Sequence, residues 1–163
     1  AWMETTDFFT APASTRFHAA YEGGLLDHSM NVYNVLISKH FDPASDDIES
    51  FTIVSLLHDL CKAGFYKTEL RNRKNDRGEW EKVPVYTVDD QFPYGHGEKS
   101  VYLIERFMRL RTEEAMAIRW HMGFSGPEDN RTVGQALQRY PLAFALAMAD
   151  MEASYFLENE DRL

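Results

Sequence analysis

Apolar side chains recur at helical spacing through most of the chain, so the sequence predicts a mostly helical fold. Over residues 25–40 an apolar stripe with a period near 3.6 residues predicts an amphipathic helix. A second helix is expected to begin near Asp46, which can form a capping box with Glu49, and to end at Gly64. The remaining predicted helices cover residues 97–110 and 112–121, a short segment after the loop at 123–130, and a last stretch that begins at Pro141.

The segment after Pro141 is apolar on every side until Asp150. Proline is favoured at the first position of a helix, so Pro141 marks its beginning. A helix without a polar face is normally buried. We therefore expect this to be the central helix of the fold.

Residues 66–90 change to the pattern of a β-hairpin. Two runs of alternating β-branched and aromatic residues flank the turn-forming segment 75–78, and Pro84 indicates an edge. Between Lys62 and Lys82 there are seven basic and four acidic residues, a local charge of +3. This hairpin could be a solvated surface element or an electropositive flap beside an anionic substrate.

These patterns predict an all-α fold, a helical bundle with a small β-hairpin insertion around residues 66–90. A length of 163 residues with 44% hydrophobic content suits a single domain over residues 1–163. No apolar run approaches the roughly 20 residues that cross a bilayer, and no leader pattern is present. With Cys61 as the single cysteine, we expect a cytoplasmic protein without a membrane partner.

The net charge of −9 argues against strong non-specific binding of nucleic acids, which requires a basic surface. A small ligand is more compatible with this charge than a long polyanion. The oligomeric state stays open.

A histidine and an aspartate stand side by side at His58-Asp59, inside the run 55–62. An imidazole nitrogen and a carboxylate oxygen from one helical turn suit a borderline-to-hard divalent metal ion. The pair alone is a weak signal. Four further ionisable residues stand in segments that should be apolar or lie at helix ends: His28, His96, His121 and Asp150.

Each of these four has an ordinary explanation when taken alone. His28 could be a hydrogen-bonded core histidine, His96 a loop residue, and His121 a cation at a helix C-terminus. Asp150 is harder to explain, because a buried carboxylate is costly unless it is paired, caps a helix or binds metal. One metal centre accounts for all four, and ligands that point inward from several helices are a standard way to build one.

Four histidines and two aspartates suit Fe, Mn, Co, Ni or Zn better than Ca or Mg. Six protein ligands exceed what one catalytic ion needs while it keeps an open position for water. We therefore expect two divalent transition-metal ions, with iron or manganese as the leading candidates and zinc, nickel or cobalt as alternatives. Asp59 is the best candidate for a bridging carboxylate, since its neighbour His58 ties it to one ion.

The ordered set of His28, His58-Asp59 and Asp150 resembles the motif of the HD superfamily of metal-dependent phosphohydrolases. The resemblance covers residues 16–155. It implies an all-α bundle, whereas superfamily membership alone does not fix the reaction.

Further residues resemble the two-metal branch of that superfamily, which includes cyclic-dinucleotide phosphodiesterases and dinucleoside-tetraphosphate hydrolases. His96 and His121 match its additional ligands, and Lys62 completes an H-D-x-x-K form in which the lysine helps to hold phosphate. Residues 17–28 are similar to the HD module of a bacterial exoribonuclease that trims RNA from its 3′ end. Nothing in the sequence resembles the separate OB-fold of that enzyme.

The resemblance implies two ligand sets that share Asp59: His28, His58, Asp59 and Asp150 for the first ion, and Asp59, His96 and His121 for the second. Asp59 and Lys62 are the catalytic candidates, with Lys62 neutralising a phosphate oxygen. The candidates for substrate contact are Lys62, Arg16, His18 and Lys99, and for the last three a surface role is an equal alternative.

The resulting hypothesis is metal-dependent hydrolysis of a phosphoester bond in a small phosphorylated substrate, a nucleotide or a small phosphodiester. Two alternatives remain open. Some relatives with the same ligand set use a mixed-valent di-iron centre to oxidise small molecules, and a nucleotide-binding sensor would have no turnover. The ligands alone do not decide between water and dioxygen chemistry.

Overall fold

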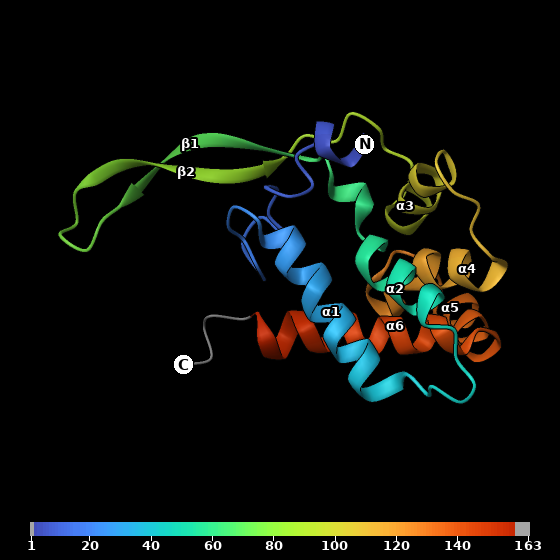
Figure 1. Cartoon of the computed structure of the whole chain (residues 1–163). Coiled ribbons are helices and arrows are strands. Elements are labelled where there is room, and N and C mark those ends of the chain that lie inside the picture. The colour runs from blue at the N-terminus through green and yellow to red at the C-terminus, as the bar shows by residue number, and fades with distance from the viewer. Residues whose placement is uncertain (1, 159–163) are drawn as a thin grey trace.

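The computed structural model describes residues 2–158, which form a helical body from which a two-stranded arm projects (Figure 1). The helices are α1 (Gly24–His40), α2 (Ile48–Leu57), α3 (His96–Glu105), α4 (Thr112–Trp120), α5 (Asn130–Arg139) and α6 (Pro141–Glu152). Four short turns of helix accompany them: η1 (Trp2–Thr5), η2 (Leu60–Lys62), η3 (Gly123–Ser125) and the π-helical η4 (Ala153–Leu157).

The core lies where α6 packs against α1 and α4, with α2 against α1 (Figure 1). Its fully buried side chains come from the apolar stripes of these helices: Leu25, Val32, Leu36, Val54, Ile118 and Leu146. Burial of such side chains stabilises the fold by about 1.5–3 kcal/mol each. None of the helices within residues 2–158 combines the length and hydrophobicity required to span a membrane.

The arm consists of β1 (Tyr66–Lys74) and β2 (Trp80–Val88), paired antiparallel from Tyr66 opposite Val88 to Lys74 opposite Trp80. At its tip, the side chain of Asn75 accepts hydrogen bonds from the backbone N–H groups of residues 77 and 79. The hairpin predicted around residues 66–90 is present, but the all-α class is wrong. Two nine-residue strands make the protein a mixed α/β fold that is predominantly helical.

The bounds of the second helix differ from those predicted. Asp47, rather than Asp46, caps α2 by accepting the backbone N–H of Glu49 at 3.0 Å. The helix ends at Leu57, because the chain tightens into η2 before Gly64. His58 and Asp59 therefore lie just past the helix end rather than inside the helix.

The last helix is not buried on every side. Leu142 and Leu146 are buried, whereas Phe144, Met148 and Met151 are 49%, 41% and 42% exposed. Residues spaced by four and then three positions share one helix face, so these three form an apolar stripe. The helix is central, since it packs against α1 and α4, but the expected burial of all its sides was wrong. Apolar composition alone does not tell which side of a helix the rest of the chain covers.

Candidate metal centre

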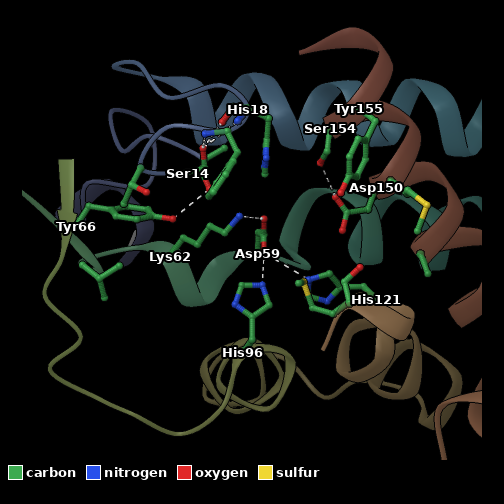
Figure 2. Close-up of a pocket in the computed structure, with 18 residues that line it drawn as sticks. Ser14, His18, Asp59, Lys62, Tyr66, His96, His121, Asp150, Ser154 and Tyr155 are labelled. Atoms are coloured by element: carbon green, nitrogen blue, oxygen red, sulfur yellow. Dashed lines mark hydrogen bonds and ion pairs between the residues drawn. The ribbon is translucent and has the colours of Figure 1, made fainter. Parts of the chain in front are cut away.

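The six predicted ligands converge in the interior of the body although they come from five separate parts of the chain. Figure 2 shows four of them, Asp59, His96, His121 and Asp150, at the wall of one pocket. Most of the six ligands stand at the ends of helices. His28 lies in α1, His58 and Asp59 lie between α2 and η2, His96 begins α3, His121 follows α4, and Asp150 lies in α6.

Backbone carbonyl groups fix the orientation of two of the histidines. The Nδ1 atom of His58 lies 2.8 Å from the carbonyl oxygen of Ser55, and that of His121 lies 2.7 Å from the carbonyl oxygen of Ile118. Because a carbonyl oxygen only accepts, both Nδ1 atoms carry the hydrogen and donate it. This tautomer leaves each Nε2 with a lone pair that faces the site, as metal-binding histidines require.

The two carboxylate oxygens of Asp59 face different histidines. Oδ2 lies 3.5 Å from Nε2 of His28 and 3.6 Å from Nε2 of His58. Oδ1 lies 2.8 Å from Nε2 of His96 and 3.5 Å from Nε2 of His121. One buried carboxylate thus stands between two groups of nitrogen donors.

The spacing of the donor atoms fits a metal ion. His28 Nε2 lies 3.2 Å from both His58 Nε2 and Asp150 Oδ1. Donors that share one ion at bond lengths of about 2.0–2.2 Å lie roughly 2.8–3.6 Å apart. In addition, Nε2 of His121 is buried and has no hydrogen-bond partner among the described residues. An unpaired buried nitrogen is costly unless it has a ligand, so the donor set suits transition-metal ions.

The charge states of His58 and Asp59 match those of metal ligands, whereas the pKa values of His28 and His121 are raised. Burial would lower the pKa of His121, but the interaction with Asp59 raises it. Burial lowers the pKa of His58 to about 3, so this ring is neutral. Burial opposes ionisation of Asp59, but Lys62 and the adjacent histidines hold its pKa well below the usual range. Burial alone would lower the pKa of His28, yet hydrogen bonds to Asp150 and Glu158 raise it to about 10. A metal ion would have to displace this proton.

Lys62 is buried beside the ligands, and its ammonium group lies 2.7 Å from Oδ2 of Asp59. Burial would lower its pKa, but Asp59 and the nearby Tyr66 hydroxyl raise it above the usual range. The side chain is therefore a fixed cation at the edge of the donor set.

A cavity of about 460 Å³ opens onto the ligands. Among the proposed substrate contacts, Lys62 and His18 line it. Burial lowers the pKa of His18, whose Nε2 has no hydrogen-bond partner within residues 2–158. Arg16 and Lys99 are not part of this lining.

These two cations lie elsewhere. Arg16 is exposed, with its guanidinium group 4.9 Å from the centre of the Phe17 ring. Lys99 lines a smaller neighbouring cavity, and its ammonium group lies 2.7 Å from Oδ1 of Asp90.

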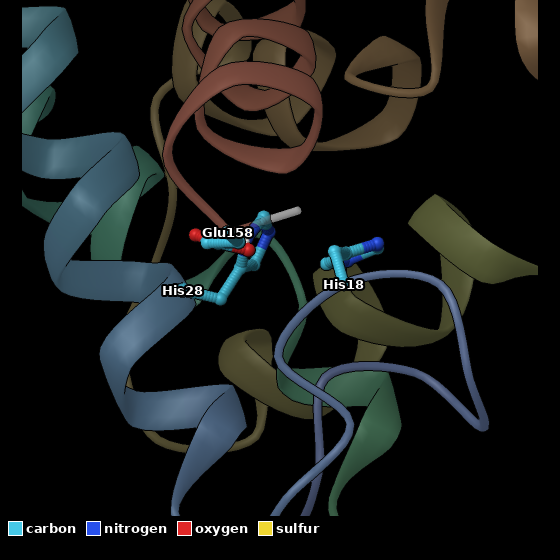
Figure 3. A group of neighbouring side chains, drawn as sticks. All are labelled: His18, His28 and Glu158. Carbon is cyan, nitrogen blue, oxygen red and sulfur yellow. Dashed lines mark hydrogen bonds and ion pairs between the residues drawn. The ribbon is translucent and has the colours of Figure 1, made fainter. Parts of the chain in front are cut away.

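Two residues that the sequence did not indicate support the predicted ligands. The carboxylate of Glu158 lies 3.0 Å from Nδ1 of His28 (Figure 3). It also accepts a hydrogen bond from the Asn31 amide at 3.0 Å. The sulfur of Cys61 lies 3.3 Å from Nδ1 of His96. Glu158 could not be found from the sequence because it stands in an acidic stretch after the last helix and belongs to no periodic pattern. Cys61, two positions after Asp59, has the character of an ordinary core residue.

Comparison of this chain with protein-family models, with curated proteins and with solved structures finds no match. The geometry of the site and the resemblance of its residues to the HD motif are therefore the features that indicate a function.

Proposed function

We propose that this protein is a metal-dependent hydrolase of phosphoester bonds, similar to the two-metal branch of the HD superfamily. The observation that carries the proposal is the position of Asp59, whose two oxygens face separate groups of histidines. A carboxylate in this position is suited to bridge two ions. Nucleotides and small phosphodiesters are the substrates that this class of site suits.

The proposed ligands fall into two sets that share Asp59. His28, His58, Asp59 and Asp150 would hold the first ion, and Asp59, His96 and His121 the second. Two divalent ions held by these residues, with iron or manganese as the leading candidates, would supply Lewis acidity and would lower the pKa of water for attack on phosphorus.

The protein's own side chains orient the substrate and offset its charge. The ammonium group of Lys62 is placed to neutralise a non-bridging phosphate oxygen, as cationic clamps do in phosphoryl transfer. His18 is neutral at pH 7, and its unpaired Nε2 can form a hydrogen bond with a substrate oxygen. The walls of the cavity keep these groups partly shielded from water, which strengthens both interactions.

The test joins metal analysis to turnover. Asp59→Ala and His58→Ala are expected to lose both metal loading and phosphoester hydrolysis in Mn²⁺- or Fe²⁺-supplemented protein. Asp76→Ala, at the exposed tip of the arm, is the matched control and should change neither. A metal-free Asp59→Ala protein with full activity would contradict the proposal. Oxygen consumption by iron-loaded protein without release of phosphate or nucleoside would instead favour the oxygenase alternative.

A further inference from the structure

The cavity beside the ligands has little fixed positive charge. Among its described lining residues Lys62 is the only lysine or arginine, and it already faces Asp59. Of the other proposed substrate contacts, Lys99 is paired with Asp90 and Arg16 lies over the Phe17 ring, and neither lines the cavity. The positive charge of one lysine, together with that of the proposed metal ions, suits the negative charge of a single phosphoryl group. A triphosphate would bring further buried charges without partners, which is costly.

Much of the cavity wall is apolar and aromatic, although four hydroxyl side chains also line it (Ser14, Thr15, Ser125 and Ser154). Its large apolar and aromatic members are Phe17, Tyr66, Met122, Met151 and Tyr155, which come from the N-terminal loop, the base of the arm, the segment after α4, and α6 with η4. Aromatic rings and methionine side chains form favourable contacts with flat ring systems. This wall therefore suits a nucleobase.

The size of the cavity also limits the ligand. A volume of about 460 Å³ lies in the lower half of the range of small-molecule pockets, which is about 300–1,000 Å³. The neighbouring cavity at Lys99 measures about 280 Å³ and has Phe65 and Pro93 in its wall. One nucleoside with one phosphate fits the first cavity better than a dinucleotide does.

Longer anionic ligands are disfavoured by the charge of the whole protein. The net charge is −9, and the arm, which carries Arg71, Arg73 and Lys74, projects away from the body (Figure 1). At the base of the arm, Lys67 is already paired with Glu69 and Asp89. The long-range field therefore repels a polyanion instead of guiding it to the cavity.

We propose, on the basis of the proposed function, that the substrate is a nucleoside monophosphate and that the products are a nucleoside and inorganic phosphate. The oxygen of water forms a bond to phosphorus, and the ester bond between phosphorus and the sugar oxygen breaks. One proton of the water molecule is transferred to that sugar oxygen, and the other stays on the phosphate. The Lys62 ammonium group pairs with the phosphate, and the aromatic wall holds the base.

The first experiment compares kcat/KM of Mn²⁺-loaded protein for ribo- and deoxynucleoside monophosphates, the matching triphosphates and cyclic dinucleotides. The best monophosphate should exceed the other classes by about tenfold or more. An equal or higher value for a triphosphate or a cyclic dinucleotide overturns this inference but leaves the phosphohydrolase proposal intact. Hydrolysis of p-nitrophenyl phosphate without hydrolysis of any nucleoside monophosphate would likewise overturn this inference and leave the phosphohydrolase proposal intact. Absence of turnover with every substrate overturns both.

The second experiment tests the aromatic wall. Tyr155 is 57% exposed at the cavity, so Tyr155→Ala should fold. Loss of one aromatic contact should raise the KM for the preferred monophosphate about tenfold, and leave that for glycerol phosphate, which has no base, unchanged. Phe144→Ala, on the exposed apolar stripe of α6 and outside the cavity lining, should alter neither constant. An equal effect of Tyr155→Ala on both substrates, or no effect on either, overturns the role of this wall.

Discussion

Removal of the Glu158 carboxylate should weaken metal binding although Glu158 is not a proposed ligand. This carboxylate accepts the Nδ1 hydrogen of His28 at 3.0 Å and is itself held by the Asn31 amide. It therefore fixes the ring so that Nε2 faces Asp59 and Asp150. In Glu158→Ala, the His28 ring would lose this orientation and the basicity that a hydrogen-bonded carboxylate gives to it.

The expected magnitude follows from comparable sites. Loss of a group that orients a metal-binding histidine typically lowers metal affinity by about 10–100-fold, which corresponds to about 1.4–2.8 kcal/mol. One effect acts in the opposite direction. Glu158 also raises the pKa of His28, so its removal makes the competing proton easier to displace. The loss in affinity should therefore be smaller at pH 6 than at pH 9.

The assay is competition for Mn²⁺ against a chelating dye at both pH values, with thermal melting of the metal-free protein as a check on folding. Glu158→Gln keeps an acceptor oxygen and should lose less affinity than Glu158→Ala. Glu152→Ala is the matched control, because this carboxylate pairs with Lys39 on the protein surface instead of with a ligand. A Glu158→Ala protein that binds Mn²⁺ within twofold of the parent at pH 9 would refute the positioning role.

Three further results are expected. Protonated His28 stabilises the metal-free fold fully below pH 6.5 and loses this effect as the pH rises through about 10. Because Mn²⁺ must displace this proton, its affinity should rise by up to about tenfold per pH unit between pH 7 and 9. An affinity that does not change with pH would contradict the role of His28 as a protonated ligand. Burial, with Asp59 nearby, raises the pKa of Cys61 to about 12, so iodoacetamide at pH 8 should alkylate the folded protein roughly 100-fold more slowly than the urea-unfolded chain; equal rates would show that the site opens readily. Leu146→Ala should lower the free energy of unfolding by about 2–5 kcal/mol in urea titrations, whereas Leu70→Ala, 66% exposed on the arm, should change it by less than about 0.5 kcal/mol.

The sequence predicted most elements because their signals are local. Helix α1 follows from its apolar stripe, and the arm follows from alternating residues around the turn at 75–78. The end of α2 could not be predicted in this way. The chain leaves the helix at Leu57 for a tertiary reason, since the backbone N–H of Cys61 donates to the Ser100 hydroxyl of α3 at 3.0 Å.

The same limit applies to the candidate site. His28 and Asp150 could be found because they are ionisable residues in apolar segments. The apolar neighbours predict burial, and burial of an ionisable group is costly unless it has a partner. Their hydrogen-bond partners are set by packing between distant segments. Glu158 reaches His28 only because η4 follows α6 back along α1, and no spacing in the sequence records that contact.

The charges around Asp59 explain how this fold tolerates a group of buried carboxylates. Asp59, Asp150 and Glu158 are ionised, and each lies beside a cation or a histidine whose pKa is raised. Lys62 offsets Asp59, and protonated His28 donates its Nε2–H to Asp150 and its Nδ1–H to Glu158. A buried carboxylate without such a partner would cost several kcal/mol. The charges of these carboxylates are thus compensated by protons and by one lysine, so metal ions that bind under the proposed function would have to displace protons.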